Sequence, residues 1–235
     1  MKQQVYIIPD DIQGDMYNDI ICTSDDCLDI EKICFSDTPY KQHNNGSSGS
    51  VTNVYIIDMY YKNKSIIIQL PKYKLINMTA DDITIGVDKM LYQYLINPLE
   101  EQIILSVHDN SEKWFNGKKF TMNKIINSLD SPYSKQHNTL KLSINNNTVY
   151  FNKYKNTIQK DNIIINDNQS IDIICLVKIA NLQFLNNKFT YTLQLQQAKV
   201  FMEEYLIKYS IIDDDDDGVD NISDIISITS SNRNS

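Results

Sequence analysis

Between Lys188 and Val200, polar and apolar residues alternate with a period of two. One set holds Phe189, Tyr191, Leu193 and Leu195, and the other holds Lys188, Thr190, Thr192, Gln194 and Gln196. Successive side chains of a strand point to opposite faces, so this alternation predicts a strand with one buried face. The Ile-rich run Ile171–Phe184 precedes it, and Asn186-Asn187 forms a turn between the two. We therefore expect a long antiparallel strand pair whose buried face the rest of the chain must cover.

Two further strand pairs are predicted on the N-terminal side of this one. They join Val51–Asp58 to Lys64–Leu70, and Thr139–Ile144 to Thr148–Lys155. The first pair turns near Tyr60-Tyr61-Lys62-Asn63. The second turns at Asn145-Asn146-Asn147, where asparagine tolerates the left-handed conformation of a tight turn.

Residues 88–129 have the spacing of helices instead. Asp88–Leu95 fits a first helix, Pro98 suits the first turn of a second, and Thr121 would cap a third that runs to Leu129. Strands at both ends with helices between them predict an α+β fold. Its sheet is mostly antiparallel and can curl into a barrel, and the helices form an insertion.

Composition divides the chain into three parts. Residues 1–50 are an acidic N-terminal arm and linker, with an apolar run at Val5–Ile8, a predicted helix over Leu28–Phe35 and the flexible segment 44–50. Residues 51–212 are the α+β body. Residues 213–235 are predicted to be a disordered acidic tail, because the adjacent carboxylates of Asp213–Asp217 repel one another.

The net charge of −8 is spread unevenly along the chain. Residues 1–51 contain three lysines and nine acidic residues, residues 52–209 contain eighteen and fourteen, and residues 210–235 contain Arg233 and seven aspartates. A mildly basic body therefore lies between two acidic ends. The ends either keep an Ile-rich protein in solution, or the tail competes with a polyanion for the body.

The sequence contains no recognisable catalytic motif. It has three histidines, His43, His108 and His137, and no nucleophile elbow, zinc-protease motif, phosphate loop or dinucleotide fingerprint. No apolar run reaches the roughly 18 residues of a membrane span, and the N-terminus does not resemble a secretory signal. We predict a protein that is not an enzyme, uses no cofactor and does not bind a membrane.

The cysteines leave two interpretations open. Cys22, Cys27 and Cys34 with His43 would supply four zinc ligands, but their spacing is wider than that of structural zinc sites. Reduced, unpaired thiols of an intracellular protein are the alternative. We predict no metal, and we expect Cys175 and Trp114 to be core residues.

Lysines and aromatic residues are interleaved on the predicted strands. In Tyr150–Lys155, alternation places Tyr150 and Tyr154 on one face and Phe151, Lys153 and Lys155 on the other. Rings that stack on bases and ammonium groups that follow phosphates suit single-stranded nucleic acid. Tyrosines half-buried at the edge of an ordinary sheet are the alternative. The candidate binding residues are Lys141, Tyr150, Lys153, Tyr154, Lys155, Lys178 and Lys188.

The segment after the aspartate run has a pattern of its own. Apolar residues lie three or four positions apart at Val219, Ile222, Ile225, Ile226 and Ile228. This spacing is typical of a short peptide that docks into a groove on a partner protein, here a replication or assembly protein. The alternative is a disordered end that contains many isoleucines only because the composition of the chain is biased. It explains the spacing equally well.

Tyr150–Lys155, the segment Lys178–Gln197 and the run Asp213–Asp217 together resemble single-stranded DNA-binding proteins of the phage and viral type. The resemblance implies an OB-like barrel with aromatic and lysine residues on its strands. It also implies an acidic tail that occupies the DNA groove in the free protein and recruits replication partners. This tail ends in Arg233-Asn234-Ser235, without the aromatic or acidic tip of that family.

The composition, Lys113–Lys119 and the final strand pair also resemble uncharacterised proteins of large AT-rich DNA viruses. That resemblance implies an intracellular location, in the host cytoplasm or the virion. We expect non-enzymatic binding of single-stranded nucleic acid, limited by the acidic tail. The alternative is a structural or assembly protein, such as a virion component, without affinity for nucleic acid.

Overall fold

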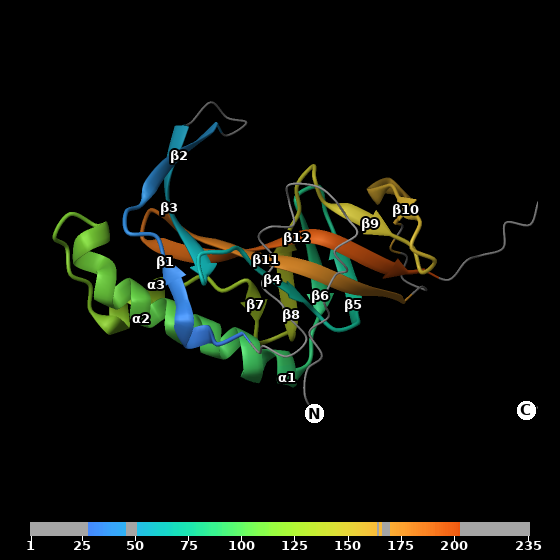
Figure 1. Cartoon of the computed structure of the whole chain (residues 1–235), viewed down its shortest axis with the longest axis horizontal. Coiled ribbons are helices and arrows are strands. Elements are labelled where there is room, and N and C mark those ends of the chain that lie inside the picture. Colours follow the sequence, from blue (N-terminus) through green and yellow to red (C-terminus); the bar gives the residue numbers. More distant parts are fainter. Residues whose placement is uncertain (1–27, 46–50, 164, 166–169, 203–235) are drawn as a thin grey trace, which may run out of the picture. The chain divides into compact units, whose positions relative to one another are not determined.

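The computed structural model describes residues 28–45, 51–163, 165 and 170–202. Its centre is a closed five-stranded barrel (Figure 1). In pairing order the strands are β5 (Tyr73–Met78), β6 (Asp82–Gly86), β8 (Thr139–Ser143), β12 (Lys188–Phe201) and β11 (Ile171–Leu185). β11 pairs in turn with β5, which closes the barrel; the β8–β12 contact is parallel and the others are antiparallel. This is the Greek-key order of an OB-type barrel, so the predicted α+β fold is confirmed.

β11 and β12 form the strand pair that the alternation predicts. Their register runs from Asp172 opposite Phe201 to Leu185 opposite Lys188, and Asn186 in the turn has a φ of 56°. The predicted inner set is buried in the core: Phe189, Tyr191, Leu193 and Leu195. Two irregularities in the register increase the local twist and help the pair to curl around the barrel.

The second edge of β11 carries three strands in succession. β3 (Val51–Tyr61), β4 (Ile66–Gln69) and β5 all pair with it and run in the same direction. The predicted hairpin of Val51–Asp58 with Lys64–Leu70 is therefore wrong. Tyr61 and Lys64 do bridge across a two-residue turn. β11 is long enough to take β3 and β4 end to end, so their pairing with β11 replaces pairing with each other.

The second predicted hairpin, Thr139–Ile144 with Thr148–Lys155, is also wrong. β8 and β9 (Val149–Phe151) both lie parallel to β12 and follow one another along its free edge. The hydroxyls of Ser143 and Thr148 donate to β12 carbonyl oxygens at 3.3 and 2.9 Å, which holds the intervening loop against β12. β9 then pairs with β10 (Thr157–Ile158), before a short 3-10 helix, η4 (Lys160–Asn162).

Strands also form within the predicted arm and linker. β1 (Ile33–Phe35) and β2 (Tyr40–Asn45) pair with successive parts of β3, and β2 projects away from the barrel (Figure 1). The predicted helix over Leu28–Phe35 is wrong, because a 3-10 turn, η2 (Ile30–Lys32), leads into β1. Pairing with β3 places Ile33 in the core, and tertiary packing of this kind outweighs helix propensity in a short segment. Val5–Ile8 lies outside the described residues.

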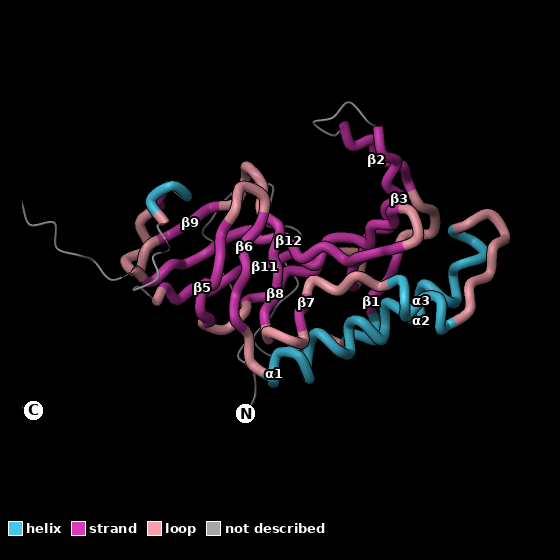
Figure 2. The backbone as a smooth tube through the Cα atoms, turned by 180° about the vertical axis from the view of Figure 1, so that it is seen from behind, coloured by secondary structure: helices cyan, strands magenta, loops and turns pink. Residues whose placement is uncertain are grey.

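The helical insertion lies between β6 and β8 and is continuous over residues 89–114 (Figure 2). It comprises α1 (Lys89–Leu91), the π-helix η3 (Tyr92–Ile96) and α2 (Asn97–Trp114). Two separate helices were predicted here. The π-turns before Pro98 keep the chain helical where its missing N–H would interrupt an α-helix. α3 (Met122–Ser128) follows as predicted, but Thr121 at its N-cap position makes no side-chain capping hydrogen bond. β7 (Tyr133–Ser134) then pairs with β8. None of the helices in the described ranges is long and apolar enough to cross a membrane.

α2 packs where β11 and β12 extend beyond the barrel. The Trp114 ring is 5% exposed, and its centroid lies 6.4 Å from that of Phe184 and 6.1 Å from that of Phe35. Phe184 in turn stacks on Phe189 at 5.2 Å. Trp114 is therefore the core anchor that the sequence predicts, and Cys175, at 1% exposed, is a core residue as predicted.

A buried carboxyl group joins α2 to the barrel. Glu100 of α2 is 9% exposed, and its Oε1 accepts hydrogen bonds from the hydroxyls of Tyr191, at 3.0 Å, and of Ser131. Burial, which is the larger cause, and the neighbouring Glu100, which is the second, raise the pKa of Tyr191 well above its usual value. The phenol therefore keeps its proton and donates a hydrogen bond. Because buried polar groups are costly without partners, these two bonds make burial of Glu100 tolerable.

We predict that Tyr191→Phe lowers the free energy of unfolding by about 1–3 kcal/mol, because the buried carboxyl loses one of two donors. Urea denaturation followed by circular dichroism measures the change. Tyr150→Phe is the matched control, since the Tyr150 hydroxyl is buried and has no hydrogen-bond partner among the described residues. An equal loss of stability in both variants would contradict a special role for the bond to Glu100.

Candidate nucleic-acid interface

The structure separates the residues that the sequence proposes for nucleic-acid binding. Lys141 lies on the outer face of β8, opposite Thr84 of β6. Its Nζ is 2.8 Å from Oδ2 of Asp82, so an acidic partner on the neighbouring strand compensates its charge. Lys178 lies on β11, and Lys188 lies at the turn between β11 and β12, at the opposite end of β12 from Phe201. These three lysines therefore lie on different parts of the barrel and its extension.

Tyr150 points into the barrel, and its ring does not offer a stacking surface. It is 4% exposed and belongs to the core, because it lies opposite the small, buried Ala198 in the parallel pairing of β9 with β12. Burial raises the pKa of its phenol to about 12. Alternation predicted a common face for Tyr150 and Tyr154, but β9 ends at Phe151 and the alternation stops there.

Lys153, Tyr154 and Lys155 lie together in the turn that follows β9. The Asn152 side chain builds this turn, because its Oδ1 accepts hydrogen bonds from the backbone N–H groups of Tyr154 and Asn156, each at 3.0 Å. Tyr154 is 59% exposed, and the Lys153 Nζ lies 4.9 Å from the centroid of its ring. The turn therefore presents one ring and two ammonium groups on the same loop.

The register brings further aromatic and basic residues to the same end of the barrel. On the outer face, Asp172 of β11 lies opposite both Lys74 and Phe201, while Lys199 lies opposite Phe151. Because β9 runs parallel to β12, the turn after Phe151 lies toward the same strand end as Phe201. Residues far apart in the sequence thus meet on one outer surface.

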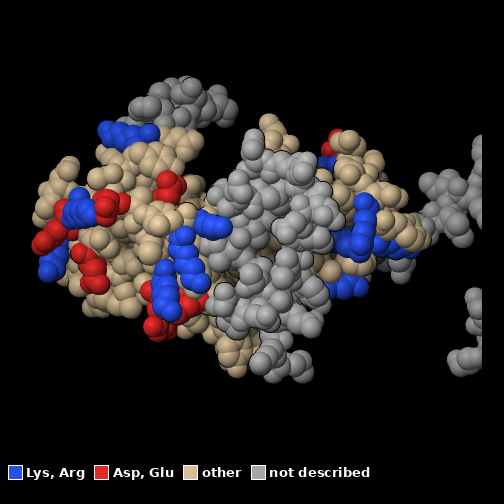
Figure 3. Space-filling view, in the orientation of Figure 1, with Lys and Arg blue, Asp and Glu red and all other residues tan. Residues whose placement is uncertain are grey.

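Phe201 is flanked by two ammonium groups. The Nζ atoms of Lys72 and Lys199 lie 4.4 and 5.3 Å from its ring centroid, within the range of cation–π contact. Lys72 also forms an ion pair with Asp172 at 3.1 Å. Figure 3 shows lysines gathered over this end of the molecule, whereas lysines and acidic residues are mixed at the other end.

We call this region the aromatic–lysine surface. Its members are Lys72, Lys74, Phe151, Lys153, Tyr154, Lys155, Lys199 and Phe201. Rings with ammonium groups beside them can stack on bases while the charges follow the phosphates. Sequence reasoning missed Phe201 because the last strand was expected to end at Val200. The same alternation, continued past Leu195, would have placed Lys199 and Phe201 on the buried face. They lie on the outer face because the register shifts by one residue between Leu195 and Gln197, which the sequence pattern did not show.

Among the described residues, no three His, Cys, Asp or Glu side chains come together in a way that would hold a metal ion. Cys34 is exposed on β1 and Cys175 is buried in β11. Cys22, Cys27 and the aspartates Asp213, Asp214, Asp215, Asp216 and Asp217 lie outside the described ranges, so the zinc alternative and the tail stay untested.

Comparison with known proteins finds no matching family model and no matching curated protein. Among solved structures, the chain is similar to the single-stranded DNA-binding protein from bacteriophage Enc34, with a TM-score of 0.35 and 9% identity over 74% of this chain and 96% of that one. It is also similar to gp2.5, a single-stranded DNA-binding protein of bacteriophage T7, with a TM-score of 0.35 and 14% identity over 81% and 98%. Likeness of this degree assigns neither a family nor a function to the chain.

The raised pKa of Tyr150 predicts a loss of stability in alkali. The unfolded chain ionises this phenol near pH 10, whereas the folded protein holds its proton until about pH 12. Its contribution is therefore complete below pH 10 and is lost as the pH rises toward 12. We expect the melting temperature to fall less steeply from pH 10 to 12 in Tyr150→Phe than in the original chain. Tyr94→Phe is the control, because Tyr94 is 63% exposed. An identical fall of the melting temperature with pH in the original chain and in both variants would contradict the prediction.

Proposed function

We propose that this protein binds single-stranded nucleic acid at the aromatic–lysine surface and is not an enzyme. The observation that carries the proposal is the Phe201 ring between the ammonium groups of Lys72 and Lys199, on the same barrel end as the exposed Tyr154. Each stacked base contributes about 1–3 kcal/mol, and each nearby lysine adds a salt-sensitive phosphate contact. The location of this surface on an OB-type barrel supports the same function.

The chemistry of the surface favours unpaired bases without sequence specificity. Rings can stack only on bases that are free of their own duplex stack. The chain has a single arginine, Arg233, so it lacks the guanidinium forks that read guanine edges in a duplex groove. Lysines act as point charges that follow a flexible backbone. DNA and RNA are both compatible with these contacts.

The acidic tail would compete with nucleic acid for this surface. β12 ends at Phe201, so the chain leaves the described fold at the aromatic–lysine surface itself. Asp213–Asp217 follow within a reach of about 40 Å of extended chain. Carboxylates that occupy the lysines would weaken nonspecific binding, because nucleic acid must displace them. Docking of replication or assembly proteins on the apolar segment beyond the aspartates belongs to the same proposal.

We expect Tyr154→Ala/Lys155→Ala to weaken binding of fluorescein-labelled oligo-dT at least about fivefold, as loss of one stacked base requires. The salt dependence should also fall by about 0.7 in the slope of log K against log salt, because one phosphate contact is removed. Fluorescence anisotropy measures both effects.

The matched control is Lys89→Ala/Tyr94→Ala, which removes the same two residue types from the exposed face of the helical insertion. It should bind like the original chain. An equal loss in both double variants would place binding elsewhere. Absence of binding by every protein at low salt would rule out the proposal and favour a structural or assembly role, which predicts a stable oligomer in light scattering.

Deletion of residues 213–235 should tighten oligo-dT binding at low salt and have less effect at high salt, where charge competition is screened. The full-length variant in which Asp213–Asp217 are all changed to Asn separates the effect of the tail's charge on binding from the effect of its length. It should bind as tightly as the deletion. If it instead behaves like the original chain, the carboxylates do not compete with nucleic acid.

A further inference from the structure

The sheet extension formed by β3, β4 and β11 has apolar residues on both of its faces. On the inner face, Ile57 and Met59 of β3 and Ile66 of β4 belong to the core that α2 covers. Val54, Ile56 and Ile67 alternate with these residues and therefore point to the opposite face. Yet they are only 5%, 2% and 8% exposed, and they are not part of the core cluster. We call this second side the outer strand face.

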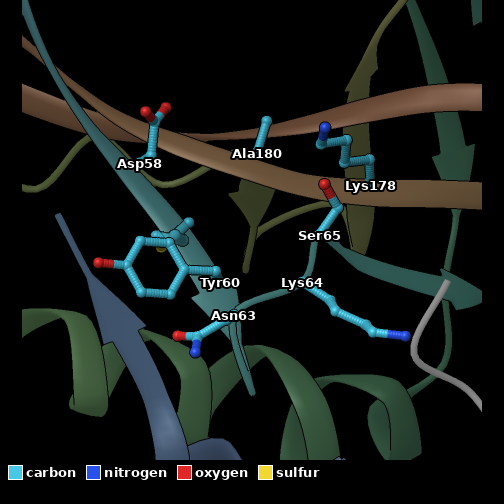
Figure 4. A pocket seen from close by; sticks show the side chains of 8 residues that line it. Asp58, Tyr60, Asn63, Lys64, Ser65, Lys178 and Ala180 are labelled. Atoms are coloured by element: carbon cyan, nitrogen blue, oxygen red, sulfur yellow. The ribbon is translucent and has the colours of Figure 1, made fainter. Parts of the chain in front are cut away.

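Lysines surround a cavity on the outer strand face. The cavity has a volume of about 490 Å³, and Tyr60, Asn63, Lys64 and Lys178 are among the residues that line it (Figure 4). Lys178 lies opposite Ile67 in the pairing of β11 with β4, so its charge borders the apolar residues directly. Lys62, in the adjoining turn, is also exposed. Asp58 contributes the opposing charge at this rim. The face thus combines an apolar centre with a mainly basic edge.

The described chain begins close to this edge. β1 pairs antiparallel with β3, and Ile33 lies opposite Tyr61. Before Ile33 the chain forms η2, which contacts α2, and Leu28 and Ile30 pack against the core. Another 27 residues precede Leu28, and when extended they would span about 90 Å, more than enough to cross the face.

The chemistry of residues 1–27 complements this surface. They contain one lysine and six aspartates, together with the apolar run Val5–Ile8. Their aspartates match the lysine edge, and their apolar residues match Val54, Ile56 and Ile67. The C-terminal segment leaves the fold farther from this face, because β12 ends opposite Asp172 and the face lies along β11 from Leu176 to Gln183. Its aspartates are already assigned to the lysines around Phe201 by the proposed function.

We propose that residues 1–27 dock on the outer strand face of their own chain, with the Val5–Ile8 run over the isoleucines and the aspartates beside Lys62, Lys64 and Lys178. This docking covers the second apolar face of the sheet extension. It does not rest on the proposed nucleic-acid binding, whose surface includes Phe201, opposite Asp172 near the start of β11.

Zero-length carbodiimide cross-linking of the full-length chain tests the proposal, because it joins a carboxylate to an amine only where the two are in contact. We expect linked peptides between an aspartate of residues 1–27 and Lys62, Lys64 or Lys178. The ion pairs Lys72–Asp172 and Lys141–Asp82, at 3.1 and 2.8 Å, are internal positive controls. An equal mixture of unlabelled and 15N-labelled protein distinguishes links within a chain from links between chains.

The expected links should fall severalfold in the full-length variant Val5→Ser/Ile7→Ser/Ile8→Ser, and they should persist in the matched control Ile222→Ser/Ile225→Ser. Three outcomes would overturn the proposal. The first is linkage of the three lysines to Asp213–Asp217, which would make the C-terminal segment the occupant. The second is linkage of residues 1–27 only between chains, which would make the face a dimer contact. The third is linkage of the control pairs alone.

Discussion

The long antiparallel pairing of β11 with β12 is the interaction on which the rest of the structure depends. At one end, the two strands complete the barrel through β5 and β8. At the other end, they extend beyond it and support β3 and α2, where Phe184 contacts Trp114 and Phe189. One strand pair therefore belongs to two packing units. Inward residues alternate on either side of the two register irregularities, so a further shift of one residue would expose apolar side chains of both units at once, which fixes the register strongly.

The sequence predicted the elements of this fold better than their partners. Alternation and apolar runs are local properties, so they located β3, β4, β8, β9, β11 and β12. The barrel strands β5 and β6 were not predicted. Pairing is a competition between edges, and β11 and β12 offer longer edges than the neighbouring segments offer one another. β3 therefore joins β11 instead of folding back on β4, and β9 joins β12 instead of β8. Tyr150 is an example. It lies opposite Ala198 in the parallel pairing of β9 with β12, so its ring points toward the core, although the ring was proposed as a binding residue on the surface.

The candidate interface follows the same rule. The interleaving of lysine and aromatic residues was visible in the sequence. Lys153, Tyr154 and Lys155 lie together in one turn, and their role in binding stays a prediction. The contact between Lys72 and Phe201 could not be predicted from the sequence, because β11 lies between β5 and β12. Only the register of β5, β11 and β12 together places the Lys72 ammonium group over the Phe201 ring. Lys141 was proposed from its strand alone, and the acidic partner Asp82 lies on another strand, β6. Charge compensation of this kind appears only after the strands are paired.

The structure shows where the lysines of this unevenly charged chain lie. Lysines border two separate surfaces, one at the barrel end around Phe201 and one on the outer strand face around Lys178. In the sequence, Asp213–Asp217 follow Phe201, and the aspartates of residues 1–27 precede the strand that pairs with Tyr61. Exposed charges separated by more than about 10 Å are largely screened at physiological salt, so an acidic segment would affect only those lysines against which it lies. A net charge of −8 is therefore compatible with a locally basic surface for nucleic acid, provided that the two acidic segments are engaged at different places.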